Sequence, residues 1–193
     1  MKPIRYRQIH LDFHTSPHIP GIGSRFDADE FGDTLLAAGV DSINLFAKCH
    51  HGMFYYPTAI GTMHPGLAFD LFGAQVDACR KRGIRTIAYT CAGWNEDWAD
   101  RHPEWLQVSP EGVVGLKRPF DSHYYGWRTL CIGRPEYRAQ LKAELSEIAE
   151  RYAPRGVEGF WIDIVLSRRC VCDHCRKDMA NRGLDPSRPE DLA

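Results

Sequence analysis

Carboxylates and imidazoles gather where short apolar runs end in this chain of 193 residues. Asp163 closes an apolar run that begins at Val157, and a carboxylate at the end of a buried strand is costly unless it is paired or used. His10, Asp12 and His14 are spaced by two, so in a strand their side chains point to the same face. A carboxylate beside imidazoles suits nucleophilic or general acid–base chemistry.

The group in the first apolar run allows three interpretations. We expect His10, Asp12 and His14 to bind a ligand, because polar side chains near the end of a strand converge on one face of the fold. A structural layer of hydrogen-bonded Asp and His is the second interpretation. The third is metal binding, since a His-x-His pair in the first strand also begins the metal-dependent amidohydrolase barrels, although Asp12 is not part of that pattern.

Two further apolar runs end in polar or aromatic side chains. Lys48, His50 and His51 place a cation and two imidazoles at the end of the second run, where they can donate hydrogen bonds to vicinal hydroxyls. Tyr89 and Trp94 surround a flexible glycine after the third run and would form a wall for the apolar face of a sugar ring. The alternatives are a solvated pair of loop histidines and aromatic rings that only pack the core.

Two acids, Glu96 and Asp97, follow the third run. They are candidate partners for Asp163. They are equally suited to cap a short helix over residues 98–102, so both interpretations stay open.

Three cysteines lie within six residues as Cys170-x-Cys172-x-x-Cys175. Zinc favours tetrahedral sulfur and nitrogen ligands, so this spacing supplies three ligands for structural zinc, with Cys131 or His174 as the fourth. Free or redox-active thiols are the alternative.

Strand-like and helix-like segments alternate four times, which predicts a parallel sheet with right-handed crossovers. No G-x-G-x-x-G follows the first strand, which argues against a dinucleotide-binding sheet. A closed barrel needs about 200–250 residues, so we predict an α/β fold of (β/α) TIM-barrel type that contains about four βα units, the N-terminal half of a barrel, as one domain over residues 1–193. The predicted strands cover residues 7–14, 42–48, 84–91 and 158–166, and the main helices 27–38, 69–82, 135–152 and 173–182.

Charge and composition exclude several classes of partner. Lys and Arg number 24 against 25 Asp and Glu, a formal charge of -1, which argues against nucleic acid and against a charged membrane surface. No apolar run approaches the roughly 20 residues that cross a bilayer. Seven cysteines without a secretory signal indicate reduced thiols and a cytoplasmic protein.

Two motifs resemble those of retaining α-L-fucosidases. Residues 47–53, Ala-Lys-Cys-His-His-Gly-Met, resemble the A-K-H-H-D-G-F motif after the second strand of that family, and residues 160–163, Phe-Trp-Ile-Asp, resemble its W-F-D-G motif, whose Asp is the nucleophile. More closely, residues 7–185 resemble the uncharacterised glycosyl-hydrolase-like barrel domain of a second group of bacterial α-L-fucosidases. The marks of that domain are residues 10–14, 80–84 and 88–94 and the Cys-x-Cys-x-x-Cys segment.

The resemblance implies a retaining glycoside hydrolase of α-L-fucosidase type, with Asp163 as the nucleophile and a carbohydrate as the substrate. It implies no organic cofactor. The sugar contacts would come from His10, Asp12, His14, His50, His51, Tyr89 and Trp94, with Lys48 or Arg168 adding charge.

The chain also departs from the fucosidase pattern. Cys49 precedes the histidines, Gly52 stands where Asp-Gly is expected, and the resemblance covers about half of such an enzyme, without a counterpart of its general acid. A metal-dependent hydrolase with His10 and His14 as ligands, or a non-catalytic carbohydrate-binding fragment, are therefore the alternatives. Because an isolated half barrel has uncovered strand edges, we also expect a homo-oligomer.

Overall fold

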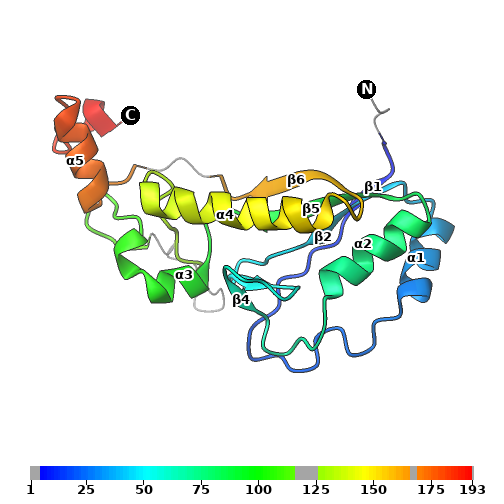
Figure 1. The fold of residues 1–193 in the computed structure, drawn as a ribbon. Helices are drawn as coiled ribbons and strands as arrows, with labels where there is room; N and C mark the ends of the chain where they lie inside the picture. The colour runs from blue at the N-terminus through cyan, green and yellow to red at the C-terminus, as the bar shows by residue number, and fades with distance from the viewer. Residues whose placement is uncertain (1–4, 116–125, 166–168, 193) are drawn as a thin grey trace.

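A four-stranded parallel sheet forms the centre of the structure, a computed structural model that describes residues 5–115, 126–165 and 169–192. The strands lie in the order β1-β2-β5-β6, so each of these strands pairs with its neighbour in the chain, as predicted for successive βα units (Figure 1). All three pairings are parallel, and Phe46 of β2 is in register with Tyr89 of β5. The strands are β1 (Gln8–His10), β2 (Ser42–Phe46), β5 (Arg85–Cys91) and β6 (Val157–Asp163).

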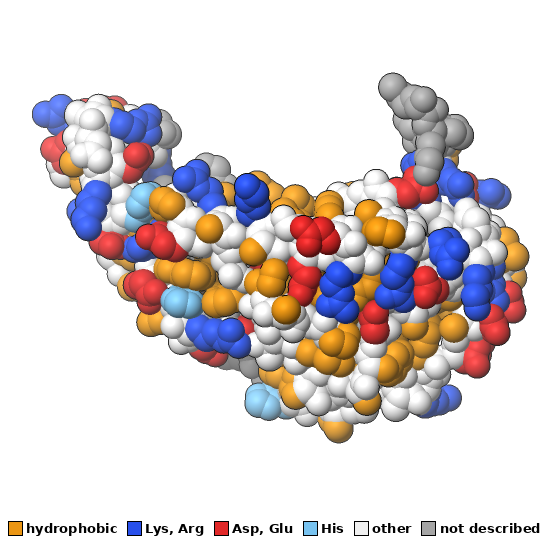
Figure 2. Space-filling model, in the orientation of Figure 1, with side chains coloured by type: hydrophobic (Ala, Val, Ile, Leu, Met, Phe, Trp, Pro, Cys, Tyr) orange, Lys and Arg blue, Asp and Glu red, His pale blue; other side chains and the backbone are white. Residues whose placement is uncertain are grey.

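Helices cover one face of this sheet and leave the other face to polar and aromatic side chains. Ile43 and Leu45 of β2 are buried in the core with apolar side chains of α1 (Ala28–Ala37), α2 (Leu71–Lys81) and α4 (Pro135–Tyr152). Asn44 and Phe46 alternate with them and therefore point to the opposite face. Figure 2 shows acidic and basic side chains interspersed on the outer side of the molecule, in keeping with its formal charge of -1.

The helix boundaries follow local signals in the sequence. The side chain of Asp27 accepts hydrogen bonds from the backbone N–H of Asp29 and of Glu30 at 2.9 and 2.8 Å, so it caps α1. Gly39 ends the same helix with φ of 71°, a conformation that glycine adopts without strain. α4 begins at Pro135, where the missing N–H costs no helical hydrogen bond, and ends at Tyr152 as predicted.

Three strands end earlier than the sequence predicted. β2 ends at Phe46 rather than residue 48. β1 ends at His10 rather than residue 14, because the last hydrogen bond to β2 is a long one of 3.4 Å from Leu11 N to Asn44 O, after which the chain leaves the sheet. β6 ends at Asp163 rather than residue 166, because Ile164 takes a left-handed φ of 53° that stops the extended backbone.

The remaining elements are short. A small two-stranded sheet lies in the segment between β2 and α2, and α5 projects from the end of the molecule farthest from α1 and α2 (Figure 1). These elements are β3 (Met53–Phe54), β4 (Thr62–Met63), α3 (Glu96–Arg101), η1 (Pro103–Trp105), α5 (Asp173–Asn181) and η2 (Pro189–Leu192).

The sheet is open within the described part of the chain. β6 pairs only with β5, and its Phe160, Trp161 and Ile162 are 37%, 49% and 44% exposed. Large apolar side chains on an uncovered edge indicate a surface that further structure normally covers. Among the described helices, none is both long enough and apolar enough to cross a membrane.

Candidate functional site

Asp163 lies at the C-terminal end of β6 with both carboxylate oxygens engaged. The Tyr89 hydroxyl donates to Oδ2 at 2.7 Å, and the backbone N–H of Ile164 donates to Oδ1 at 2.8 Å. Burial would raise the pKa of Asp163, but the hydrogen bonds from Tyr89 and Ile164 outweigh burial and hold the pKa below its usual value. The carboxylate is therefore ionised and oriented at neutral pH, as a nucleophile must be.

The backbone after Asp163 is held in a strained conformation. Among the described residues, Ile164 is the single non-glycine residue with positive φ, and a β-branched side chain in this region costs about 1–3 kcal/mol. Gly93 packs against it so closely that a Cβ at residue 93 would lie 2.5 Å from the Ile164 carbonyl oxygen. Ile164 donates its N–H to Asp163, and Gly93 packs against Ile164, so both residues help to position that carboxylate.

His50 extends the hydrogen-bond chain behind Asp163. Its Nε2 lies 2.8 Å from the Tyr89 hydroxyl oxygen, and because Tyr89 gives its own proton to Asp163, His50 Nε2 must be the donor in this pair. Burial, and then the neighbouring His14, lower the pKa of His50 to about 3, so its ring is neutral. His50 Nδ1 therefore carries no proton and has a lone pair that can accept a hydrogen bond from a ligand hydroxyl.

His14 packs against His50 and has a defined tautomer. The two rings are stacked with centroids 3.7 Å apart, and the His50 backbone N–H donates to His14 Nδ1 at 3.1 Å. The proton is then on Nε2, which lies 3.3 Å from a carboxylate oxygen of Asp12. Asp12 is 70% exposed at its side chain, so it is open to a ligand while it orients His14.

His10 lies on the same side of Asp163. The Asn44 side-chain amide donates to His10 Nδ1 at 3.1 Å, and the Asn44 oxygen accepts from Gln8 at 2.7 Å, which fixes the Asn44 orientation. The proton of a neutral His10 is therefore on Nε2. Its ring lies 5.2 Å from Tyr89 and 6.0 Å from Trp161, centroid to centroid. His10, Asp12 and His14 thus gather around Asp163, although Asp12 and His14 lie beyond the end of β1.

Aromatic rings enclose the histidines. Trp94 meets His50 edge-on at 5.0 Å, and Trp127 lies 4.5 Å from His51, 5.4 Å from His50 and 6.3 Å from Trp94. Burial lowers the pKa of His51. The sequence analysis did not select Trp127. The concentration of tryptophans between the third strand and the third main helix could have pointed to it, but their spacing does not show which tryptophan packs against the histidines.

Lys48 is the clear correction to the predicted site. Its side chain is fully buried and its amine forms an ion pair with Glu144 of α4, which also accepts a hydrogen bond from Trp98 Nε1 at 2.9 Å. Lys48 lies beyond the end of β2 and its side chain turns to the layer of α4, so its charge stabilises the packing of the helix and is not presented to a ligand.

The remaining candidates are two acids that bind other side chains and one arginine that lies outside the described residues. Glu96 binds the Arg128 guanidinium at 2.7 Å, and Asp97 accepts from Thr62 at 3.0 Å, so neither is a partner of Asp163. The cap of α3 is Asn95, whose side chain accepts from Trp98 N at 3.0 Å. Arg168 lies outside the described residues.

The donor arrangement does not favour a metal held by His10 and His14. Nδ1 of each ring already accepts a hydrogen bond, and Nε2 of His14 faces Asp12. Within the described residues, the group of His, Cys, Asp or Glu that is gathered as closely as metal ligands consists of Cys131, Cys170, Cys172 and Cys175, whose sulfurs all lie within 4.8 Å of one another.

Comparison with known families identifies the family of the chain. A model of the family described as hypothetical glycosyl hydrolase 6 matches residues 27–164, which span the sheet from β2 to the residue after Asp163. The chain belongs to this glycosyl hydrolase family. No curated protein matches it.

Solved structures extend the comparison. The chain is 38% identical to α-L-fucosidase isoenzyme 2 from Paenibacillus thiaminolyticus with a TM-score of 0.88, over 98% of this chain and 28% of that one. It shares its fold, at 22% and 20% identity, with a GH29 α-L-fucosidase from Bacteroides thetaiotaomicron (TM-score 0.51, over 72% of this chain and 28% of that one) and a cold-adapted β-galactosidase from Rahnella sp. R3 (TM-score 0.59, over 80% and 21%). The chain thus spans less than a third of the length of each of these proteins.

Proposed function

We propose that this chain provides the nucleophile and one wall of the sugar site in a retaining glycoside hydrolase of α-L-fucosidase type. The observation that carries the proposal is Asp163, an oriented and ionised carboxylate at a strand end, hydrogen-bonded to Tyr89 and Ile164, with His50 Nε2 3.6 Å from its Oδ2. The identity of 38% to a fucosidase supports fucose as the sugar.

The proposed architecture is the first part of a (β/α) barrel. The parallel order β1-β2-β5-β6 and the strand-end position of Asp163 agree with the rule that barrel sites lie at the C-terminal ends of the strands. The exposed apolar edge of β6 is where the next strand would pair.

In the proposed mechanism Asp163 attacks the anomeric carbon and forms a glycosyl-enzyme ester, while a second carboxylic acid protonates the leaving oxygen and later activates water. That acid would come from outside the described residues. Tyr89 shares the charge of Asp163 in the resting state and releases it as the new bond forms. His50 Nδ1 accepts a hydrogen bond from a sugar hydroxyl, whereas Nε2–H of His10 donates one.

A fluoride leaving group needs no protonation, so 2-fluoro-fucosyl fluoride tests the nucleophile without the general acid. We expect the folded chain to gain one 2-fluoro-fucosyl group over hours, with peptide mass spectrometry placing it on Asp163. Asp163→Asn should gain none, and the exposed surface variant Asp33→Asn should label like the wild type.

Two results would count against the proposal. A label on another carboxylate would show that the other residue, and not Asp163, is the nucleophile. Fucose binding without any label on the folded wild type would instead identify a non-catalytic carbohydrate-binding fragment.

A further inference from the structure

We propose that Cys131, Cys170, Cys172 and Cys175 hold one structural zinc ion that fastens α5 to the rest of the chain. This inference does not depend on the proposed glycosidase activity. The four sulfurs come from two segments that are far apart in the sequence: Cys131 in the turn before α4, and residues 170–175, which lead into and begin α5.

The distances between the sulfurs fit a single shared ion. Four sulfurs at about 2.3 Å from zinc in a tetrahedron lie about 3.8 Å apart. Here all four lie within 4.8 Å of one another, and Cys131 and Cys175 are 3.5 Å apart. A disulfide brings two sulfurs to about 2.05 Å and sets no position for the remaining two cysteines. Four sulfurs gathered around one point instead indicate one metal ion that all four bind. All four are free cysteines, and two of them are fully buried.

The backbone around the sulfurs is built to hold them. The Arg134 N–H donates to the Cys131 carbonyl at 3.0 Å, which closes a turn behind that sulfur. The Val171 N–H donates to Val108 O at 2.8 Å and keeps the segment between Cys170 and Cys172 in place. Four protein thiolates complete a tetrahedron and leave no open position, so the zinc would be structural rather than catalytic.

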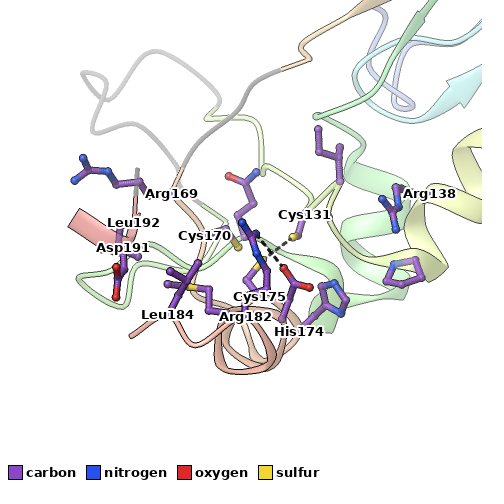
Figure 3. Close-up of a pocket in the computed structure, with 16 residues that line it drawn as sticks. Cys131, Arg138, Arg169, Cys170, His174, Cys175, Arg182, Leu184, Asp191 and Leu192 are labelled. Atoms are coloured by element: carbon purple, nitrogen blue, oxygen red, sulfur yellow. Dashed lines mark hydrogen bonds and ion pairs between the residues drawn. The ribbon is translucent and has the colours of Figure 1, made fainter. Parts of the chain in front are cut away.

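Several arginine side chains lie near the cysteines, where positive charge would suit an anionic centre. Four thiolates and one Zn²⁺ carry a net charge of about −2. Arg134 is 93% buried there, pairs with Asp173 beside Cys172, and its Nε has no hydrogen-bond partner among the described atoms. A pocket of about 910 Å³ opens next to the cysteines, and Arg138, Arg169 and Arg182 are among the residues that line it (Figure 3).

The ion would hold α5 in place where few of its apolar side chains are buried. Among the described residues of α5, Met179 is the buried one, and Val171 and Cys172 before the helix are also buried. The helix projects from the end of the molecule, beyond α3 and the start of α4 (Figure 1). A zinc bridge from residue 131 to residue 175 would therefore fasten α5 to the turn before α4.

Elemental analysis of the chain, purified under reducing conditions from zinc-supplemented medium, tests the proposal. We expect about one zinc per chain in the wild type and less than a tenth of that in Cys172→Ser. Cys79→Ser, which removes a buried thiol of α2 outside the cluster, should keep its zinc. Cobalt-loaded protein should show thiolate-to-cobalt charge transfer and the visible bands of a tetrahedral site.

A second measurement uses only the wild type, so it holds even if Cys172→Ser does not fold. Chelation should make the four cluster thiols reactive to an alkylating reagent together and should expose residues 169–184 to proteolysis. Wild-type protein without metal, stoichiometric iron in place of zinc, zinc retained in Cys172→Ser, or disulfides among the four cysteines would each overturn the proposal.

Discussion

Replacement of Lys48 by methionine should destabilise the fold strongly while leaving the sugar site intact. The Lys48 amine and the Glu144 carboxylate are 0% and 1% exposed at their side chains. In Lys48→Met the Glu144 carboxylate would keep only the neutral donors Trp98, at 2.9 Å, and Gln140, at 3.3 Å. A buried charge that loses its partner costs about 3–5 kcal/mol.

The expected change is large enough to measure by two methods. For a chain of 193 residues the entropy of unfolding is about 0.4 kcal/mol per degree, so a loss of about 4 kcal/mol lowers Tm by about 10 °C. Urea unfolding monitored by tryptophan fluorescence gives the free energy directly. The control is Arg7→Met, which breaks a surface pair with Asp41 in which Arg7 is 72% exposed and should cost less than about 1 kcal/mol.

A double variant separates the ion pair from packing. Lys48→Met combined with Glu144→Gln removes both charges and keeps an oxygen for Trp98, so it should recover most of the loss seen in Lys48→Met. If Lys48→Met lost less than about 1 kcal/mol of stability and yet labelled with 2-fluoro-fucosyl fluoride tenfold more slowly, Lys48 would belong to the sugar site and our reasoning would be refuted.

Three more outcomes follow from the site and the sheet. Gly93→Ala should lower the free energy of unfolding by about 1–3 kcal/mol and slow labelling, since its methyl group would meet the Ile164 carbonyl oxygen at 2.5 Å, whereas Gly159→Ala, with its nearest neighbour at 3.5 Å, should not. The pKa of His50 is about 3 in the folded state and about 6.5 in the unfolded chain, so between pH 7 and pH 5 only the unfolded chain takes up a proton at this residue. His50 should therefore lower the free energy of unfolding by about 2 kcal/mol over this range, which urea titrations measure. His50→Asn should abolish this contribution. The isolated chain should self-associate in sedimentation experiments through the uncovered edge of β6, and Ile162→Lys should shift it toward monomer; a wild type that is monomeric at all concentrations would contradict this.

The sequence alone determined the order of the elements and most of their boundaries. The apolar runs, the cap Asp27, the stop Gly39 and the start Pro135 are local signals, and each acts within one turn of its own position. The strand-end rule also brought Asp163 and His10 to one face, because parallel strands in sequential order must place their C-terminal ends side by side.

What the tertiary structure decided was the direction of individual side chains where the regular strands end. Lys48 follows β2, and no local pattern shows that α4 brings a carboxylate to it from residue 144. Trp127 joins the histidines, and Cys131 joins the other three cysteines, because long segments fold back over the ends of the strands. Strand periodicity fixes the facing of a side chain only inside a strand; beyond it, the facing depends on which distant element packs there and on the charge or hydrogen bond that this element provides.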